Sequence, residues 1–234
     1  MKKVILAINF VLFSSVLGMV DWASEWFEKA EIMELLGEIK PDRKQFEWLN
    51  AARSGNLATI DRMIKNGMDL NVKDMITGDT ALIIAAQNEN PKMVERIIKG
   101  NTSEVRGMVI ERKNSGRKLS DQSISRWMDR VFTNVNARDN NGNTALMDAA
   151  ADGYENIVRL LIDNNADVNA KDKGGYTALM MAAAAGCENI VRLLIDNHAD
   201  VNARNKCGYT ALMDAREDGY YGIVRLLRSA GAKD

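Results

Sequence analysis

Apolar residues recur at helical spacing in two short stretches that alternate along the second half of the chain. The first stretch, Thr177–Ala185, is rich in alanine, which costs the least free energy in a helix, and it ends at the helix-breaking Gly186. The second stretch begins at Glu188 and carries a stripe of aliphatic side chains suited to burial. The members of this stripe are Ile190, Val191, Leu193, Leu194 and Ile195. The pattern predicts a unit built of turn, helix, turn, helix and loop.

This unit returns every 33 residues. The segments Thr144–Ala170 and Thr177–Ala203 differ at only four of their 27 aligned positions, and a more diverged copy begins at Thr210. A fixed period of this length is typical of stacked arrays, because one unit cannot bury its apolar stripes without a neighbour. We therefore predict an all-α solenoid rather than a single globular core.

Two weaker copies lie upstream. One begins near Phe46 and lacks its leading turn, and the next begins at Gly78 and continues with Thr80. In this second copy we expect an irregular turn between the two helices. The reason is that Glu89 takes the place of the glycine and Pro91 starts the next helix.

An insertion interrupts the second copy. Thr80 and Thr144 are 64 residues apart, which is one period plus an insertion of 31, and we place it at about 101–130. The resulting plan has five repeats, at 42–74, 75–138, 139–171, 172–204 and 205–234. The ends of a solenoid need caps that face solvent. We assign these roles to an amphipathic helix within 19–41 and to Arg216, which replaces an alanine of the other repeats.

The third unit carries the residues of a known repeat. The matching positions are Asp139, Gly142, Thr144, Leu146, Ala149, Ala150, Gly153, Ile157, Val158, Leu160, Leu161 and Ala166–Ala170. On these residues, many of which recur in three consecutive copies, the chain resembles the ankyrin repeat. The resemblance implies about five stacked helix-turn-helix repeats with short turn or hairpin fingers. The chain departs from the family where Ala145 replaces proline and Met147 replaces histidine, so the usual threonine–histidine hydrogen bond is absent.

The first twenty residues predict a targeting segment. Lys2 and Lys3 precede an uncharged, largely apolar run, Val4–Val20, that ends at Asp21, as in a secretory signal peptide. Cleavage after Gly18 would remove residues 1–18 and give a bacterial-type exported protein, periplasmic or secreted. At 17 residues the run is at the short limit for a membrane span, so an uncleaved membrane anchor is the alternative.

The charge, the two cysteines and the single histidine limit the kinds of partner and site that we expect. The net charge of −1 shows no basic excess, which argues against nucleic acid as a partner. Cys187 and Cys207 are expected in turns at opposite ends of the helices, beyond the roughly 6 Å Cα separation of a disulfide, so we predict two free thiols. The single histidine, His198, has Asn165 as its counterpart in the preceding repeat and no clustered ligands around it. We expect no metal site, no cofactor, no catalytic residues and no enzyme activity.

The family resemblance places partner binding on the turn tips and on the concave face of the first helices. By position the tips are Asn141, Asn143, Lys173, Tyr176, Lys206 and Tyr209. The matching candidates on the first helices are Asp148, Asp152, Met181 and Asp214. We hypothesise that Tyr176 and Tyr209 are interface anchors, because tyrosine offers a large contact area with few rotatable bonds; packing along adjacent turns is the alternative. The acidic residues form either a solvated helix surface or a strip that steers a basic partner.

The insertion is the least repetitive part of the chain. Residues 101–130 hold seven Lys or Arg against four Asp or Glu, with an exposed basic loop expected around Arg117 and Lys118. The apolar spacing from Ile124 to Phe132 predicts a helix that packs on the stack. A docking element and a tolerated surface extension both fit these features.

Two function classes follow. The first is a monomeric, non-catalytic module that binds a protein partner of unknown identity. The alternative is a secreted effector or inhibitor that acts on a host or competitor protein, with residues 101–130 as its docking element. Contact with a membrane is expected only if the N-terminal segment stays uncleaved.

Overall fold

The computed structural model describes residues 42–100 and 132–233. The predicted signal peptide (1–18), the capping helix (19–41) and the insertion (101–130, with Arg117 and Lys118) lie outside the described residues. The chain divides into two compact units, Met1–Phe46 and Glu47–Asp234. The second unit contains the features that follow, apart from residues 43–46 of the first helix.

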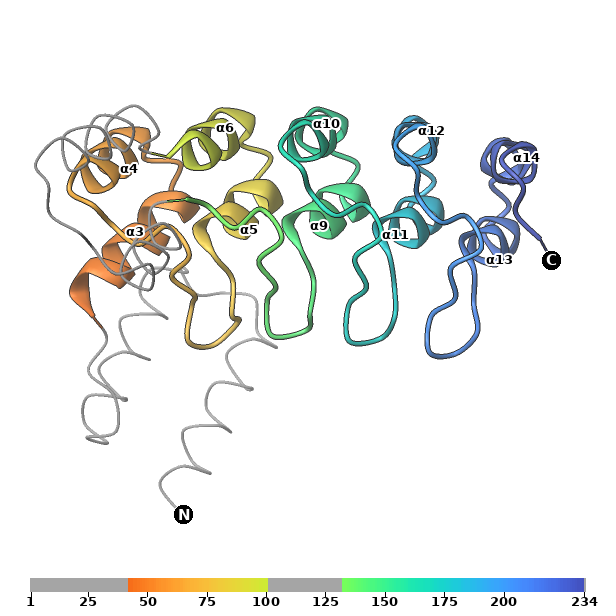
Figure 1. The fold of residues 1–234 in the computed structure, drawn as a ribbon, viewed down its shortest axis with the longest axis horizontal. Coiled ribbons are helices and arrows are strands. Elements are labelled where there is room, and N and C mark those ends of the chain that lie inside the picture. The colour runs from red at the N-terminus through yellow and green to blue at the C-terminus, as the bar shows by residue number, and fades with distance from the viewer. Residues whose placement is uncertain (1–41, 101–131, 234) are drawn as a thin grey trace, which may run out of the picture. The chain divides into compact units, whose positions relative to one another are not determined.

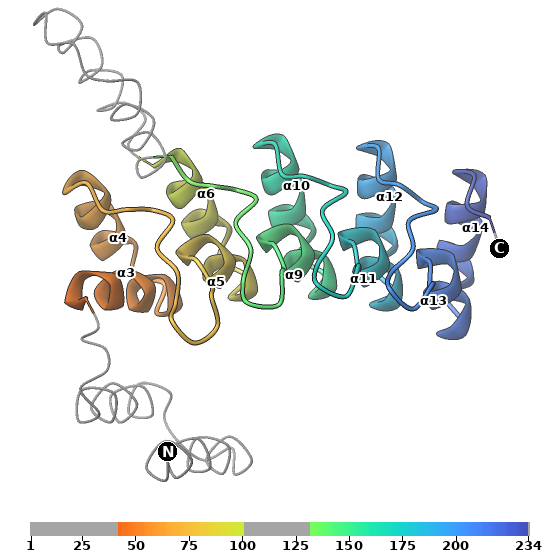
Figure 2. The ribbon, with the colours of Figure 1, turned by 60° about the horizontal axis from the view of Figure 1, so that its bottom comes forward.

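The described residues form ten α-helices in five pairs, and their only extended pairing is an isolated bridge between Lys73 and Thr80. The first helices of the pairs are α3 (Arg43–Arg53), α5 (Ala81–Gln87), α9 (Ala145–Ala151), α11 (Ala178–Ala184) and α13 (Ala211–Glu217). The second helices are α4 (Leu57–Lys65), α6 (Pro91–Lys99), α10 (Glu155–Asp163), α12 (Glu188–Asp196) and α14 (Tyr221–Ser229). First and second helices form two rows, and the loops between pairs extend beyond the first row (Figures 1 and 2). The prediction of an all-α repeat solenoid is confirmed.

The first helices depend on capping and packing, because the last four have only seven residues and helices this short are unstable alone. A threonine precedes each of these four, and its side chain accepts a hydrogen bond from the main-chain N–H three residues later. In α9 the donor is Met147, whose own side chain is buried. Thr144 therefore caps α9 through the main-chain N–H of Met147, the residue that stands where the family has histidine.

Small side chains let the first helices approach one another closely. Ala86, Ala150 and Ala183 are fully buried, and α5, α9, α11 and α13 contact one another in that order. In the last repeat the same position is Arg216, which is exposed. This exposure agrees with the predicted role of Arg216 at the end of the stack, since a charged side chain there does not have to be buried.

The turn within each helix pair requires a left-handed residue. Glycine supplies it at Gly153 (φ +81°) and Gly186 (φ +73°), and in the second repeat Glu89 adopts the same region with φ +49°. The turn is otherwise the same, since the N–H of Asn90 donates to the carbonyl of Ala85 at 3.1 Å. The prediction of an irregular turn was wrong, because the stack imposes the backbone and Glu89 accepts a strained conformation.

Asparagine side chains join each repeat to the next. Asn169 Nδ2 donates to the carbonyl of His198 at 3.1 Å, and its Oδ1 accepts from the N–H of Asp200 at 2.7 Å. Asn71 makes the same two bonds to the carbonyl of Phe132 (2.8 Å) and the N–H of Asn134 (2.6 Å). The chain therefore returns to the register of the repeat at Phe132. Contrary to the helix expected up to this residue, Phe132 is exposed and not helical.

Candidate protein-binding surface

Four loops precede α5, α9, α11 and α13, and we call them fingers 1 to 4. They span residues 74–79, 139–143, 172–176 and 205–209. Each begins with an Asp or Asn whose Oδ1 accepts main-chain N–H bonds of its own finger. This local bonding fixes the turn of each finger without help from a neighbour.

Main-chain hydrogen bonds also link each finger to the next. The N–H of Asn140 donates to the carbonyl of Thr77 at 2.8 Å, and the N–H of Lys173 donates to the carbonyl of Asn141 at 2.9 Å. The N–H of Lys206 donates to the carbonyl of Gly174 at 2.8 Å. The four fingers therefore form one bonded row, which lowers the entropy lost when a partner binds across it.

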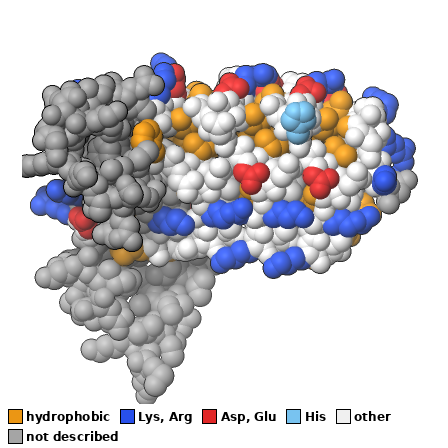
Figure 3. Space-filling model, viewed as in Figure 1, with side chains coloured by type: hydrophobic (Ala, Val, Ile, Leu, Met, Phe, Trp, Pro, Cys, Tyr) orange, Lys and Arg blue, Asp and Glu red, His pale blue; other side chains and the backbone are white. Residues whose placement is uncertain are grey.

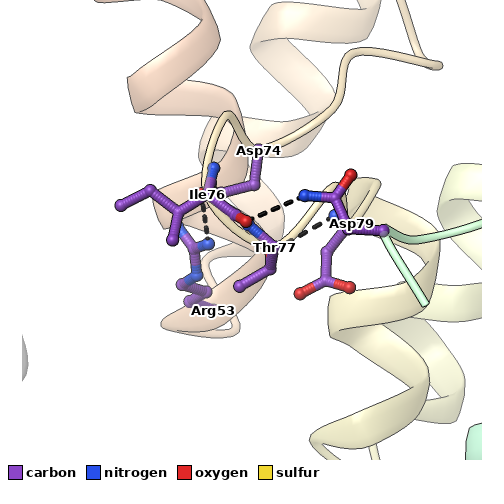
Figure 4. Close-up of polar contacts among 6 residues, drawn as sticks. Arg53, Asp74, Ile76, Thr77 and Asp79 are labelled. Carbon is purple, nitrogen blue, oxygen red and sulfur yellow. Dashed lines mark hydrogen bonds and ion pairs between the residues drawn. The ribbon is translucent and has the colours of Figure 1, made fainter. Parts of the chain in front are cut away.

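Finger 1 is anchored to α3 by a buried ion pair (Figure 4). Arg53 Nη2 lies 2.7 Å from Asp74 Oδ2, and Asp74 Oδ1 accepts the N–H groups of Ile76 (2.8 Å) and Thr77 (3.0 Å). Burial alone would raise the pKa of Asp74. The hydrogen bonds from Arg53, Thr77 and Ile76 outweigh it and hold this pKa below its ordinary value. Asp74 therefore stays ionised and keeps finger 1 in place.

Tyr176 and Tyr209 project from fingers 3 and 4, with 39% and 44% of their surface exposed. Their main-chain N–H groups donate to Asp172 Oδ1 (2.7 Å) and Asn205 Oδ1 (2.9 Å). The backbone beneath each ring is thus fixed while the ring itself remains accessible. Both residues therefore present an exposed ring on a fixed turn.

The remaining tip candidates divide into two groups. Asn141, Lys173 and Lys206 are exposed at the tips. Asn143 is half-buried, and its Nδ2 turns back toward Asp139 Oδ2 at 3.4 Å. The structure therefore gives Asn143 a role in shaping finger 2 and leaves little of its side chain for a partner.

Asp148, on the first-helix face, is half-buried and not a freely solvated surface carboxylate. Burial, together with the charges of Asp139, Asp79 and Asp152, raises the pKa of Asp148 to about 7. The hydrogen bond that Gln87 Nε2 of the preceding repeat donates to its Oδ2 at 3.0 Å opposes this shift. The interpretation of Asp148 as solvated surface was therefore wrong, whereas Asp152 is exposed as expected.

Asp214 occupies the same helical position as Asp148, two repeats further along. Burial, followed by the charges of Asp218 and Glu217, raises the pKa of Asp214. Its Oδ2 is buried and has no hydrogen-bond partner within the described part of the chain. By position, the residue corresponding to Gln87 is Ala184, which has no donor side chain. Met181 holds the same position in α11, the helix between α9 with Asp148 and α13 with Asp214, and its side chain is half-buried.

The sequence analysis overlooked the tip of finger 1. Met75 and Ile76 expose 49% and 56% of their surfaces there, where the other fingers carry Asn, Lys, Gly or Cys. The available signal was an apolar pair inside a loop that is one residue longer than the other fingers. An exposed apolar pair on a fixed turn is a natural contact for a partner.

The cysteines and the single histidine lie in turns and loops of the described residues. Within 42–100 and 132–233, no three His, Cys, Asp or Glu side chains come together as a metal site would require, and no helix is long and apolar enough to cross a membrane. Both cysteines are free, as predicted. His198 has φ +65° and its counterpart Asn165 has φ +64°. The position selects residues that tolerate a left-handed backbone, so no catalytic role is needed to explain the histidine.

Comparisons with known proteins agree with this architecture. A family model described as ankyrin repeats (3 copies) matches residues 48–172 and 169–234. Two curated proteins, each named ankyrin repeat and SOCS box protein 6, from Homo sapiens and Pongo abelii, are 33% identical over 131 residues. These matches cover 51% of this chain and 31% of each relative, so the chain matches about a third of their length.

Proposed function

This chain belongs to the ankyrin-repeat family, whose repeats are protein–protein interaction modules, and we propose that its fingers and first helices together form the surface that binds a protein partner. The proposal assigns the contact to the tips of fingers 3 and 4 and to the first-helix positions Asp148, Met181 and Asp214. Asn141, Lys173 and Lys206 lie around this contact as exposed polar neighbours.

The observation that carries the proposal is the exposure of Tyr176 and Tyr209 on fingers that are bonded to one another. Aromatic side chains on a rigid backbone provide contact area at a small entropic cost. Tyrosines of this kind are over-represented among residues that dominate binding free energy.

The first-helix positions add specificity to these anchors. A half-buried methionine lies between two repeats that each present a carboxyl group in a poorly solvated setting. A partner with an apolar side chain flanked by basic ones would complement this arrangement in shape and in charge. A basic group beside Asp214 would also supply a partner for its unbonded oxygen.

A double substitution tests the proposal. The full chain, the Tyr176→Ala/Tyr209→Ala variant and a Tyr221→Ala control would each be immobilised, and the partner captured from the native extract would be quantified. Tyr221 is 69% exposed but lies at the start of α14, away from the fingers. The Tyr221→Ala variant therefore controls for nonspecific binding through an exposed tyrosine. We expect the double variant to lose the partner and the control to keep it. Equal capture by all three would refute the assignment.

We also propose, from the apolar run Val4–Val20, that the chain is exported. N-terminal sequencing of the protein from its native source tests this, and a mature chain that starts at Met1 would contradict cleavage. Export would support the alternative of an effector or inhibitor that uses its insertion for docking. Joining Gly100 to Phe132 removes 101–131 while keeping the register of the repeats, and a partner lost only in that variant would favour the alternative.

A further inference from the structure

Six exposed cations gather along the fingers, and we call them the basic ridge. Four stand immediately before the fingers, one for each, at Lys73, Arg138, Lys171 and Arg204. The other two, Lys173 and Lys206, lie within fingers 3 and 4. Figure 3 shows Lys and Arg side chains in a row along the face of the repeats that carries the fingers.

The four cations that precede the fingers bond to main-chain carbonyls. Lys73 Nζ donates to the carbonyl of Arg138 at 2.6 Å, and Lys171 Nζ donates to the carbonyl of Arg204 at 3.2 Å. Arg138 Nη1 and Arg204 Nη1 donate to the carbonyls of Gly142 (2.9 Å) and Gly208 (2.8 Å). A carbonyl is neutral, so these bonds hold the side chains in position and leave their positive charges uncompensated.

Several cations elsewhere in the repeats form ion pairs. On the second helices, Arg159 lies 3.0 Å from Glu155 and Arg192 lies 3.3 Å from Glu188. No such ion pair involves a ridge residue in the part of the chain that the structure describes. The local positive charge is therefore a property of this face and not of the chain, whose net charge is −1.

Acidic residues beside the ridge do not neutralise it. Asp172 is turned inward and accepts the N–H of Tyr176. Asp167 and Asp200 are exposed, but each accepts the N–H of the asparagine two residues later at 3.0 Å. They flank the ridge as separate negative charges and limit how broad an anionic partner can be.

We propose that the basic ridge binds an extended acidic segment, rich in Asp or Glu, of a partner protein. The ridge adjoins the surface of the proposed function at fingers 3 and 4, where Lys173 and Lys206 lie, but its contact with carboxylates does not use Tyr176, Tyr209 or the first-helix positions. Failure of the acidic peptide to bind would therefore leave the tyrosine contact standing, and loss of the tyrosine contact would leave the ridge standing. A narrow row with at most two cations per repeat matches side-chain carboxylates spaced along a peptide, and the two arginines can bind carboxylate oxygens directly. A nucleic acid has a denser charge that Asp167, Asp200 and the overall negative charge would repel.

The test uses the full chain and a fluorescein-labelled peptide of alternating Glu and Ser, with a Lys and Ser peptide of equal length as the control probe. Fluorescence anisotropy would be measured for the wild type, for Lys173→Glu/Lys206→Glu and for Arg159→Glu/Arg192→Glu. The side chains of Lys173 and Lys206 make no hydrogen bond within the described residues, so their reversal should leave the fold intact. The second variant changes the net charge equally but lies on the second helices, which makes it a matched control.

We expect the ridge variant to bind the Glu and Ser peptide about tenfold more weakly and the control to bind it like the wild type. Binding should also weaken with added salt, since exposed charges are screened over about 10 Å at 0.1 M ionic strength. A Lys173→Gln/Lys206→Gln variant should show an intermediate loss, and a thermal melt of each variant confirms folding.

Three outcomes would overturn the proposal. The wild type could fail to bind the acidic peptide in preference to the basic one. The two charge-reversed variants could lose affinity equally, which would show an effect of net charge alone. A single-stranded oligonucleotide or a vesicle containing anionic lipid could bind more tightly than the peptide through the same lysines, which would assign the ridge to nucleic acid or to a membrane.

Discussion

The segments 144–170 and 177–203, which make up most of the third and fourth repeats, differ at only four of 27 positions. Their backbones agree at the differing positions, so the two segments form a matched pair. Tyr154 and Cys187 share φ −83° and ψ 74°, and Asn165 and His198 both have φ near +65°. The other two differences remove Asp148 and Asp152 and put Met181 and Ala185 in their places. The backbone of the repeat therefore stays constant while the side chains on the first-helix face change from acidic to apolar.

The largest effect is expected when Asp148 is replaced by the methionine of the fourth repeat. The pKa of Asp148 is raised from 3.8 to about 7 in the folded protein, so its contribution to stability is greatest at low pH and is lost as the pH rises through about 7. Asp148→Met should therefore raise the free energy of unfolding by about 2 kcal/mol at pH 8 and by little at pH 4.

Urea unfolding of the wild type and Asp148→Met across this pH range measures the difference. Asp152→Ala is the control, since Asp152 is exposed and its removal should change the free energy of unfolding little at any pH. A pH-independent difference between Asp148→Met and the wild type would show that Asp148 is not the titrating group.

Substitutions in the left-handed turn are expected to have effects of similar or smaller size. A methyl group on Gly186 would lie 2.7 Å from the ring of Tyr220, whereas one on Gly153 would lie 3.3 Å from Cys187 Sγ. Both positions have positive φ, so both alanine variants are strained, but Gly186→Ala adds a steric clash. We expect losses of about 2 kcal/mol for Gly186→Ala and about 1 kcal/mol for Gly153→Ala in thermal or urea unfolding. The reverse order would contradict the account of the turn.

Glu89 offers the opposite change at the same turn. Glu89→Gly should raise the free energy of unfolding by about 1 kcal/mol, because a non-glycine residue pays that order of energy in the left-handed region. Glu89→Ala is the control, because alanine is also strained at positive φ and should raise the free energy of unfolding little. Glu95→Gly is unsuitable as a control, because Glu95 lies inside α6. Destabilisation by Glu89→Gly would indicate that Glu89 makes a favourable contact that offsets its strain.

The smallest effect concerns the loop after the second helix. Exchanging the two residues, as Asn165→His and His198→Asn, should change the free energy of unfolding by less than about 0.5 kcal/mol, because both types tolerate positive φ. Asn165→Val should cost about 1–2 kcal/mol, since a β-branched residue is strongly disfavoured there. Chemical denaturation of the three variants tests the comparison, and a large loss in either exchange would point to a specific side-chain contact.

The repeats themselves could be predicted from the sequence because their signals are local. The capping threonines, the alanines of the first helices and the aliphatic stripes all follow from spacing within a single unit. The exposure of Tyr176 and Tyr209 followed from their place after a turn glycine.

Contacts between repeats could not be predicted in the same way. The side chain of Asp148 accepts a hydrogen bond from Gln87, which lies 61 residues earlier, before the insertion. No periodic pattern in the sequence links these two residues. The turn at Glu89 keeps the bond from the N–H of Asn90 to the carbonyl of Ala85 although Glu89 must adopt positive φ, an outcome that the propensity of one residue does not predict. Asn143 has the position of a tip residue, yet its bond to Asp139 draws it back into the finger. The partner of Asp148 lies in another repeat, whereas that of Asn143 lies in its own finger, and spacing along the sequence shows neither contact.

The most direct test makes residues 144–170 of the third repeat identical to residues 177–203 of the fourth by combining Asp148→Met, Asp152→Ala, Tyr154→Cys and Asn165→His. Affinity for the captured partner would be measured by surface plasmon resonance, alongside the free energy of unfolding. If the scaffold is constant and the variable positions recognise the partner, this variant will fold at least as stably at pH 8 but bind at least about tenfold more weakly. Unchanged affinity in a folded variant would show that the partner is recognised elsewhere and would contradict the account.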